Sequence, residues 1–143
     1  MTGKERPSKP VDLNATIFQV QDVFQGILGK NIVLRTNLDP KLGLIQGEVR
    51  KIEALLLNLF LHARDAAPPA GELTITTSNV DLDPAAAAAM SLAPGQYAQL
   101  QFVVSRQVEP DQIREKLEQL RGAIEIKPAE GRFTVTVALP RAA

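Results

Sequence analysis

The segment from Glu48 to Ala67 constrains the fold more than any other part of the sequence. Its apolar residues recur every three or four positions and form one stripe: Ile52, Leu56, Leu59, Ala63 and Ala66. This spacing predicts an amphipathic helix that buries one side. Pro68 and Pro69 follow, and they end the helix because proline has no backbone N–H and cannot continue it.

Shorter patterns predict the remaining elements. A helix is expected from Asn14 to Leu28, capped by Asp12 or Asn14 and ended by Gly29. The pattern of residues 111–121 predicts a further, short helix. Residues 81–95, with five consecutive alanines, predict a short helix or a loop. Strands are expected at residues 31–36, 73–80 and 96–105, a short extended piece at 44–46, and a hairpin of residues 123–127 and 132–139. This order predicts an α+β fold, a two-layer sandwich with a mixed, mostly antiparallel sheet and helices on one face.

Composition narrows the possible functions. The 143 residues suit one domain, expected at 11–141 behind a flexible arm of residues 1–10. Equal numbers of basic and acidic residues, 16 each, argue against a nucleic-acid partner. The chain has no cysteine and one histidine, which excludes thiolate metal sites and His-rich ones. No apolar run is long enough to span a membrane, and the start MTGKERPSKP lacks the apolar core of a signal peptide, so we expect a cytoplasmic protein.

Three polar residues of the long helix are the candidate site. Asn58, His62 and Asp65 are spaced i, i+4 and i+7, so they share one helix face. By spacing alone, this face is more often just the solvent side of a helix than a binding site.

Four stretches resemble the ATP-binding domain of two-component sensor histidine kinases. NLFLHARDA, from Asn58 to Ala66, is similar to their asparagine box, N-L-x-x-N-A-x-D-A, and PPAGELTI follows it as a Pro/Gly turn and a strand. The lead-in VDLNATIFQVQDVFQGILGKNIVL and the closing GAIEIKPAEGRFTVTVALP resemble the first and last parts of that domain. The likeness covers most of residues 11–140. It implies the Bergerat-type (GHKL) ATPase sandwich, which gyrase-type and chaperone ATPases share.

The sequence departs from that family where the nucleotide would bind. Asn58 matches the first asparagine of the box, but His62 replaces the second, and imidazole is a poorer Mg²⁺ ligand than an amide oxygen. The family's Asp-x-Gly-x-Gly box is expected after the strand QLQFVVS, where Arg106-Gln107-Val108-Glu109-Pro110 stand. In the family, the aspartate of this box accepts a hydrogen bond from the adenine amino group. Arg106 stands at the expected place of that aspartate, and a cationic side chain cannot accept such a bond. The phenylalanine box, the lid and the second glycine box have no counterpart, so the resemblance implies a domain that lacks the ATP lid.

These losses lead to three alternatives for function. The first is a non-catalytic, pseudokinase module of a two-component phosphorelay, without catalytic residues or metal. Its partner would be the receiver domain of a response regulator, or a histidine kinase or phosphotransfer protein, with a homodimer also possible. The second is residual ATP or ADP binding with Mg²⁺ through vestigial Asn58, His62 and Asp65, and the third is a small-molecule or anion pocket around His62. The candidates for a docking surface are four apolar residues, Phe18, Phe24, Ile113 and Leu117, which the sequence alone does not separate from core residues.

Overall fold

The computed structural model describes residues 10–30, 32–66, 71–105 and 111–142 of the chain. Nine elements occur in this order: α1 (Leu13–Leu28), β1 (Ile32–Asn37), α2 (Val49–Ala66), β2 (Gly71–Leu82), α3 (Pro84–Ala89), β3 (Gly95–Val104), α4 (Asp111–Gln119), β4 (Ala123–Ala129) and β5 (Arg132–Pro140). The strands form one sheet in the order β1-β2-β3-β5-β4. The β1–β2 pair is parallel and the other pairs are antiparallel, so the predicted α+β fold with a mixed, mostly antiparallel sheet is confirmed.

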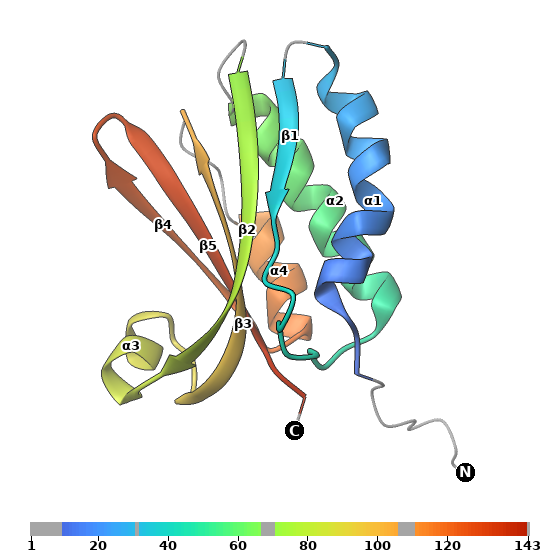
Figure 1. Cartoon of the computed structure of the whole chain (residues 1–143). Coiled ribbons are helices and arrows are strands. Elements are labelled where there is room, and N and C mark those ends of the chain that lie inside the picture. Colours follow the sequence, from blue (N-terminus) through green and yellow to red (C-terminus); the bar gives the residue numbers. More distant parts are fainter. Residues whose placement is uncertain (1–9, 31, 67–70, 106–110, 143) are drawn as a thin grey trace.

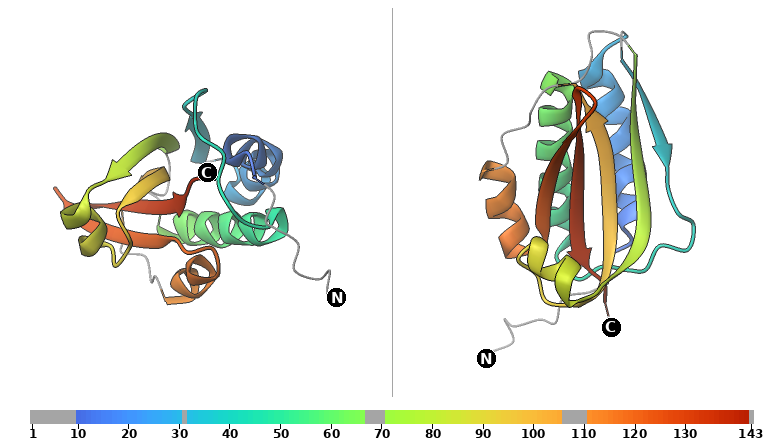
Figure 2. Two further views of the ribbon diagram at one scale, coloured as in Figure 1. Left: turned by 90° about the horizontal axis from the view of Figure 1, so that it is seen from below. Right: turned by 90° about the vertical axis from the view of Figure 1, so that its left-hand side faces the viewer.

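Two layers make up the molecule. The helices α1, α2 and α4 lie side by side on one face of the sheet, with α2 between the other two (Figures 1 and 2). The short α3 lies apart from them, at the end of the sheet where β2 passes to β3. Its existence settles the open alternative for residues 81–95 in favour of a short helix. Asp83 caps it by accepting a hydrogen bond from the Ala86 amide, and Pro84 is its first residue.

The signals at the ends of α1 act as the sequence predicts. The carboxylate of Asp12 accepts a hydrogen bond from the backbone N–H of Ala15, at 3.1 Å, so Asp12 rather than Asn14 is the N-cap. Gly29 ends the helix with φ of 82°, a left-handed conformation that glycine adopts without steric cost.

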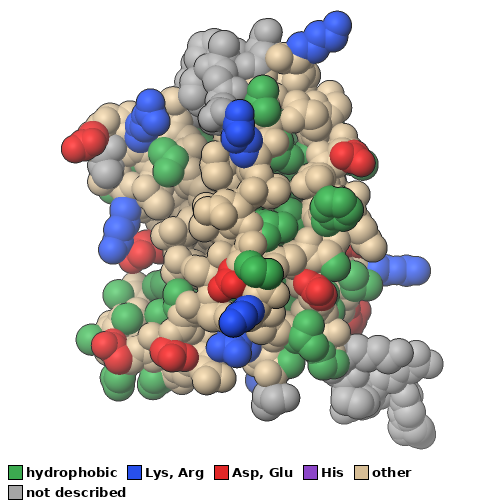
Figure 3. Space-filling view, in the orientation of Figure 1, with side chains coloured by type: hydrophobic (Ala, Val, Ile, Leu, Met, Phe, Trp, Pro, Cys, Tyr) green, Lys and Arg blue, Asp and Glu red, His purple; other side chains and the backbone are tan. Residues whose placement is uncertain are grey.

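The core lies between the helices and the sheet. Four residues of the α2 stripe, Ile52, Leu56, Leu59 and Ala63, are fully buried, and the ring of Phe60 meets the ring of Phe24 on α1 with centroids 3.9 Å apart. Alternate residues of β3 and β5 point into this layer, as the period of a strand requires. On the face seen in Figure 3, basic and acidic side chains of the described residues are interspersed. No helix in the described part of the chain is long and apolar enough to cross a membrane.

The short extended piece predicted at residues 44–46 joins the two ends of the described chain. Ile45 bridges Val11 on one side and Arg141 on the other, both antiparallel. The amide of Val11 donates to the Ile45 carbonyl at 2.8 Å, and the amide of Ala142 donates to the Leu44 carbonyl at 2.7 Å. The start and the end of the fold therefore lie at the same end of the molecule (Figure 1).

The two edges of the sheet are finished differently. Along β1, the side-chain amide of Gln25 donates to the Ile32 carbonyl and accepts from the Leu34 amide, both at 2.8 Å. This glutamine thus takes the place of a neighbouring strand over part of that edge. Among the described residues, no strand or side chain makes corresponding bonds to the outer side of β4.

Candidate functional site

The polar face of α2 is fixed by the way that this helix packs. Residues two positions apart on a helix lie about 200° apart around its axis. Because Phe60 packs against α1, Asn58 and His62 must lie on the opposite flank of α2. That flank faces α4, since α2 lies between α1 and α4 (Figure 2). Both side chains are half-buried there, one helical turn apart.

Two of the three predicted site residues are therefore brought together. Asn58 and His62 share the flank between α2 and α4, as their spacing predicts. The backbone of Asp65 continues α2 on the same flank, but its side chain lies outside the described part of the structure.

The chemistry of this flank suits a magnesium nucleotide poorly. The amide nitrogen of Asn58 donates to the Ala54 carbonyl at 3.1 Å, which turns the side chain back onto its own helix. The imidazole of His62 is a poor ligand for Mg²⁺, which prefers oxygen. Among the described residues, no three His, Cys, Asp or Glu side chains cluster closely enough to hold a metal ion.

The beginning of α4 is also a poor phosphate site. Helix N-termini attract anions through their free N–H groups and the helix dipole. Here Asp111 is in the first turn of α4, so a carboxylate already lies at that positive end and would repel a phosphate. The chain connects Val104 of β3 to Asp111 through residues 105–110 alone. The expected loss of the adenine-reading aspartate, at Arg106, falls on residues 106–110, which lie outside the described residues.

The expected docking surface is wrong for three of its four residues. Phe24 and Ile113 have no exposed surface and Leu117 is 1% exposed, because they pack into the layer between the helices and the sheet. Phe18 alone of the four is exposed, at 66% of its surface, on α1. The four residues do not form one patch.

A polar network near the start of α1 was not apparent from the sequence. The hydroxyl of Thr77 is buried, accepts from the Asp39 amide at 3.0 Å and donates to the side-chain oxygen of Asn14 at 3.0 Å. The amide nitrogen of Asn14 donates to the Asp39 carbonyl at 2.7 Å and closes the triangle. This network ties α1, β2 and the loop after β1 together, and only three-dimensional contact reveals it.

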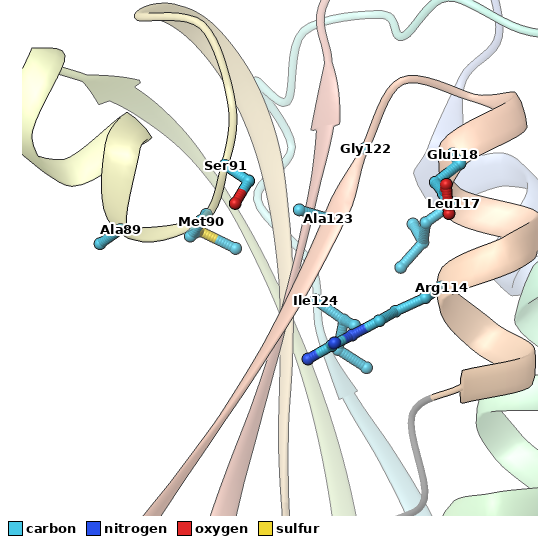
Figure 4. A pocket seen from close by; sticks show the side chains of 9 residues that line it. All are labelled: Ala89, Met90, Ser91, Arg114, Leu117, Glu118, Gly122, Ala123 and Ile124. Carbon is cyan, nitrogen blue, oxygen red and sulfur yellow. The ribbon is translucent and has the colours of Figure 1, made fainter.

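A pocket lies away from the flank of α2. It has a volume of about 390 Å³ and is bounded by the end of α3, by α4 and by the start of β4 (Figure 4). Leu117 and Ile124 supply an apolar wall, and Ser91, Arg114 and Glu118 supply polar groups. The sequence gives no sign of this pocket, because nothing in the spacing of Arg114 and Glu118 indicates that α3 lies opposite.

Known structures share this fold. The chain is similar to the mycobacterial sensor histidine kinase MprB, with a TM-score of 0.71, 14% identity and coverage of 94% of this chain and 97% of that one. It is similar to the catalytic domain of the histidine kinase ThkA, with a TM-score of 0.68, 17% identity and coverage of 95% and 97%. It also resembles the histidine kinase domain of the E. coli osmosensor EnvZ, with a TM-score of 0.66, 16% identity and coverage of 99% and 94%.

At these identities the comparison establishes the fold, which is that of a histidine kinase catalytic domain. No protein-family model matches the sequence. No curated protein matches it either.

Proposed function

We propose that this chain is a non-catalytic regulatory or protein-interaction module of two-component signalling. The observation that carries the proposal is the contrast between a kinase-type sandwich and a flank of α2 whose described residues offer few groups suited to a magnesium nucleotide. Five strands and three covering helices are present, while the flank between α2 and α4 offers an imidazole and, at the start of α4, a carboxylate. A fold kept without its nucleotide chemistry is best explained by contacts with other proteins.

The proposed partner is a protein of the same relay. The candidates are the receiver domain of a response regulator, or a histidine kinase or phosphotransfer protein, whose transfer step this chain would promote or block by docking. Neither action requires that the chain bind ATP. Phe18 on α1 is the one residue of the expected surface that is available for such a contact.

Purified components test this proposal. The full chain is titrated with individual receiver domains of its own organism, and binding is followed by isothermal calorimetry. The same chain is added to a kinase and receiver pair that transfers phosphate from ATP. We expect saturable binding to at least one receiver or phosphotransfer protein and a changed transfer rate, with Phe18→Ser weakening both. Binding to none of them, and no effect on transfer, would refute the proposal.

Residual nucleotide binding is the competing function. It is favoured by Asn58, which lies half-buried on the flank between α2 and α4 and keeps an amide oxygen that can ligate a metal. The variant His62→Asn separates the two functions, since it restores the second amide of the box and should tighten ATP binding if the chain still binds nucleotide. Under the proposed function we expect no ATP binding by the natural chain or by this variant, because Asp111 and the short connection after β3 remain.

A further inference from the structure

The free edge of β4 is the feature that the kinase-type fold and the proposed function leave unexplained. β4 is the last strand of the sheet, and within the described residues nothing pairs with its outer side. The other edge strand, β1, is partly covered by the Gln25 side chain. An uncovered edge is a template for pairing with another extended segment.

The hairpin turn determines which groups of β4 face outward. Glu130 and Gly131 both have positive φ, 50° and 77°, as a two-residue type I′ turn requires. In such a hairpin the residues that flank the turn, Ala129 and Arg132, form a hydrogen-bonded pair, and pairing alternates from there. The amide and carbonyl groups of Ile124 and Ile126 therefore point away from β5, toward the open edge.

Pro128 limits the usable part of this edge. It belongs to the same outward-facing set as Ile124 and Ile126, so its missing N–H removes a donor from the edge without breaking a bond to β5. The Lys127 side chain is 72% exposed, and its ammonium group lies 3.6 Å from the carboxylate of Glu125, two residues earlier on β4. Free pairing groups thus remain mainly at the Ile124 end of the strand.

The pocket opens at that end. Figure 4 shows the start of β4 between α3 on one side and α4 on the other, with Ala123 and Ile124 between the two walls. An extended segment laid along β4 would therefore run into a cavity of about 390 Å³ with an apolar wall.

Arg114 gives this cavity a chemical preference. Its side chain extends from α4 toward β4, beside Ile124 (Figure 4). In the part of the chain that the structure describes, its guanidinium makes no ion pair or hydrogen bond, and it does not pair with Glu118 one turn later. An unpaired guanidinium beside free strand groups suits a carboxylate, with which it can form two parallel hydrogen bonds. Glu118, at the rim, repels an acid placed one turn further and so restricts the carboxylate to the Arg114 end.

We infer that the β4 edge binds an extended acidic peptide segment, which adds a strand at Ile124 and Ile126 and places a carboxylate on Arg114. Backbone pairing would supply affinity, and the carboxylate would fix direction and register. This inference does not depend on the proposed signalling role, because the edge and the pocket are present whether or not the flank of α2 binds nucleotide.

A random eight-residue peptide library displayed on phage tests the inference. The full chain is immobilised, clones are selected for binding, and selected peptides are synthesised for titration. We expect selected sequences to share an Asp, a Glu or a free C-terminal carboxylate within a β-prone stretch. Arg114→Gln should weaken their binding by about tenfold or more, in line with a lost charged hydrogen bond. Arg132→Gln, which removes an exposed arginine at the hairpin tip, is the matched control and should leave binding unchanged.

Amide hydrogen exchange then locates the bound peptide. We expect the amides of Ile124 and Ile126 to exchange more slowly in the complex. The inference is overturned if no clone is enriched, if enriched peptides lack a carboxylate, or if R114Q binds them as well as the natural chain does. Protection of the Ile126 amide by self-association without peptide would assign this edge to a second copy of the chain instead.

Discussion

Removal of the Gln25 side chain should open the β1 edge and destabilise the fold. This side chain makes two hydrogen bonds of 2.8 Å to β1, one to the Ile32 carbonyl and one from the Leu34 amide. Each is expected to contribute about 1 kcal/mol net, and alanine returns up to about 0.7 kcal/mol through its higher helix propensity. We therefore expect Gln25→Ala to lower the free energy of unfolding by about 1–2 kcal/mol.

Urea unfolding followed by circular dichroism measures this change. With a slope of about 1–3 kcal/mol per molar urea for a small domain, the midpoint should fall by about 1 M. The control is Gln19→Ala, an exposed glutamine of the same helix, which carries the same gain in propensity without the bonds to β1. Equal stability of the two variants would refute the view that Gln25 acts as a substitute strand.

A second substitution should remove only one of the two hydrogen bonds between Gln25 and β1. Gln25→Glu keeps an acceptor for the Leu34 amide but places a carboxylate oxygen against the Ile32 carbonyl, which has no hydrogen to donate. We expect the Leu34 amide to stay protected from exchange in this variant and to lose protection in Gln25→Ala. If the Leu34 amide exchanges no faster in Gln25→Ala than in the natural chain, the hydrogen bond from Leu34 to Gln25 is contradicted.

Three further predictions follow from the described contacts. In the free chain, hydrogen exchange followed by NMR should show the Ile126 amide exchanging much faster than the Lys127 amide, because only the Lys127 amide pairs with β5. Equal rates would show that the β4 edge is covered. Thr77→Val should cost about 1–3 kcal/mol in thermal unfolding, since it leaves buried partners unsatisfied, whereas Thr76→Val should change little; a neutral Thr77→Val would disprove the network. Gly26→Ala should stabilise the fold by about 0.4–1 kcal/mol, as the helix has open space for the methyl group; destabilisation would contradict that packing.

Much of the fold follows from local sequence signals. The Asp12 cap, Gly29, the apolar stripe of α2 and the hairpin around Glu130 each depend on neighbouring residues, so their positions could be predicted. The fold class was predictable for the same reason, because the order of helices and strands restricts the possible layers.

Contacts between distant segments were not predictable. Buried and exposed apolar residues share the same spacing along a helix, so Phe24, Ile113 and Leu117 were candidates for a docking surface although they lie in the core. Gln25 has no local signal, because its partners lie on β1 and depend on where the strand packs. Arg114 has the spacing of an ordinary solvated charge until α3 and β4 are placed beside it.

The proposed loss of nucleotide binding is tested most directly by isothermal titration of the full chain with ATP and Mg²⁺ up to millimolar concentrations. We expect no saturable heat for the natural chain, and the same result for Asn58→Ala. Saturable ATP binding that disappears in Asn58→Ala would contradict the proposal, because it would show that the flank between α2 and α4 still holds a nucleotide.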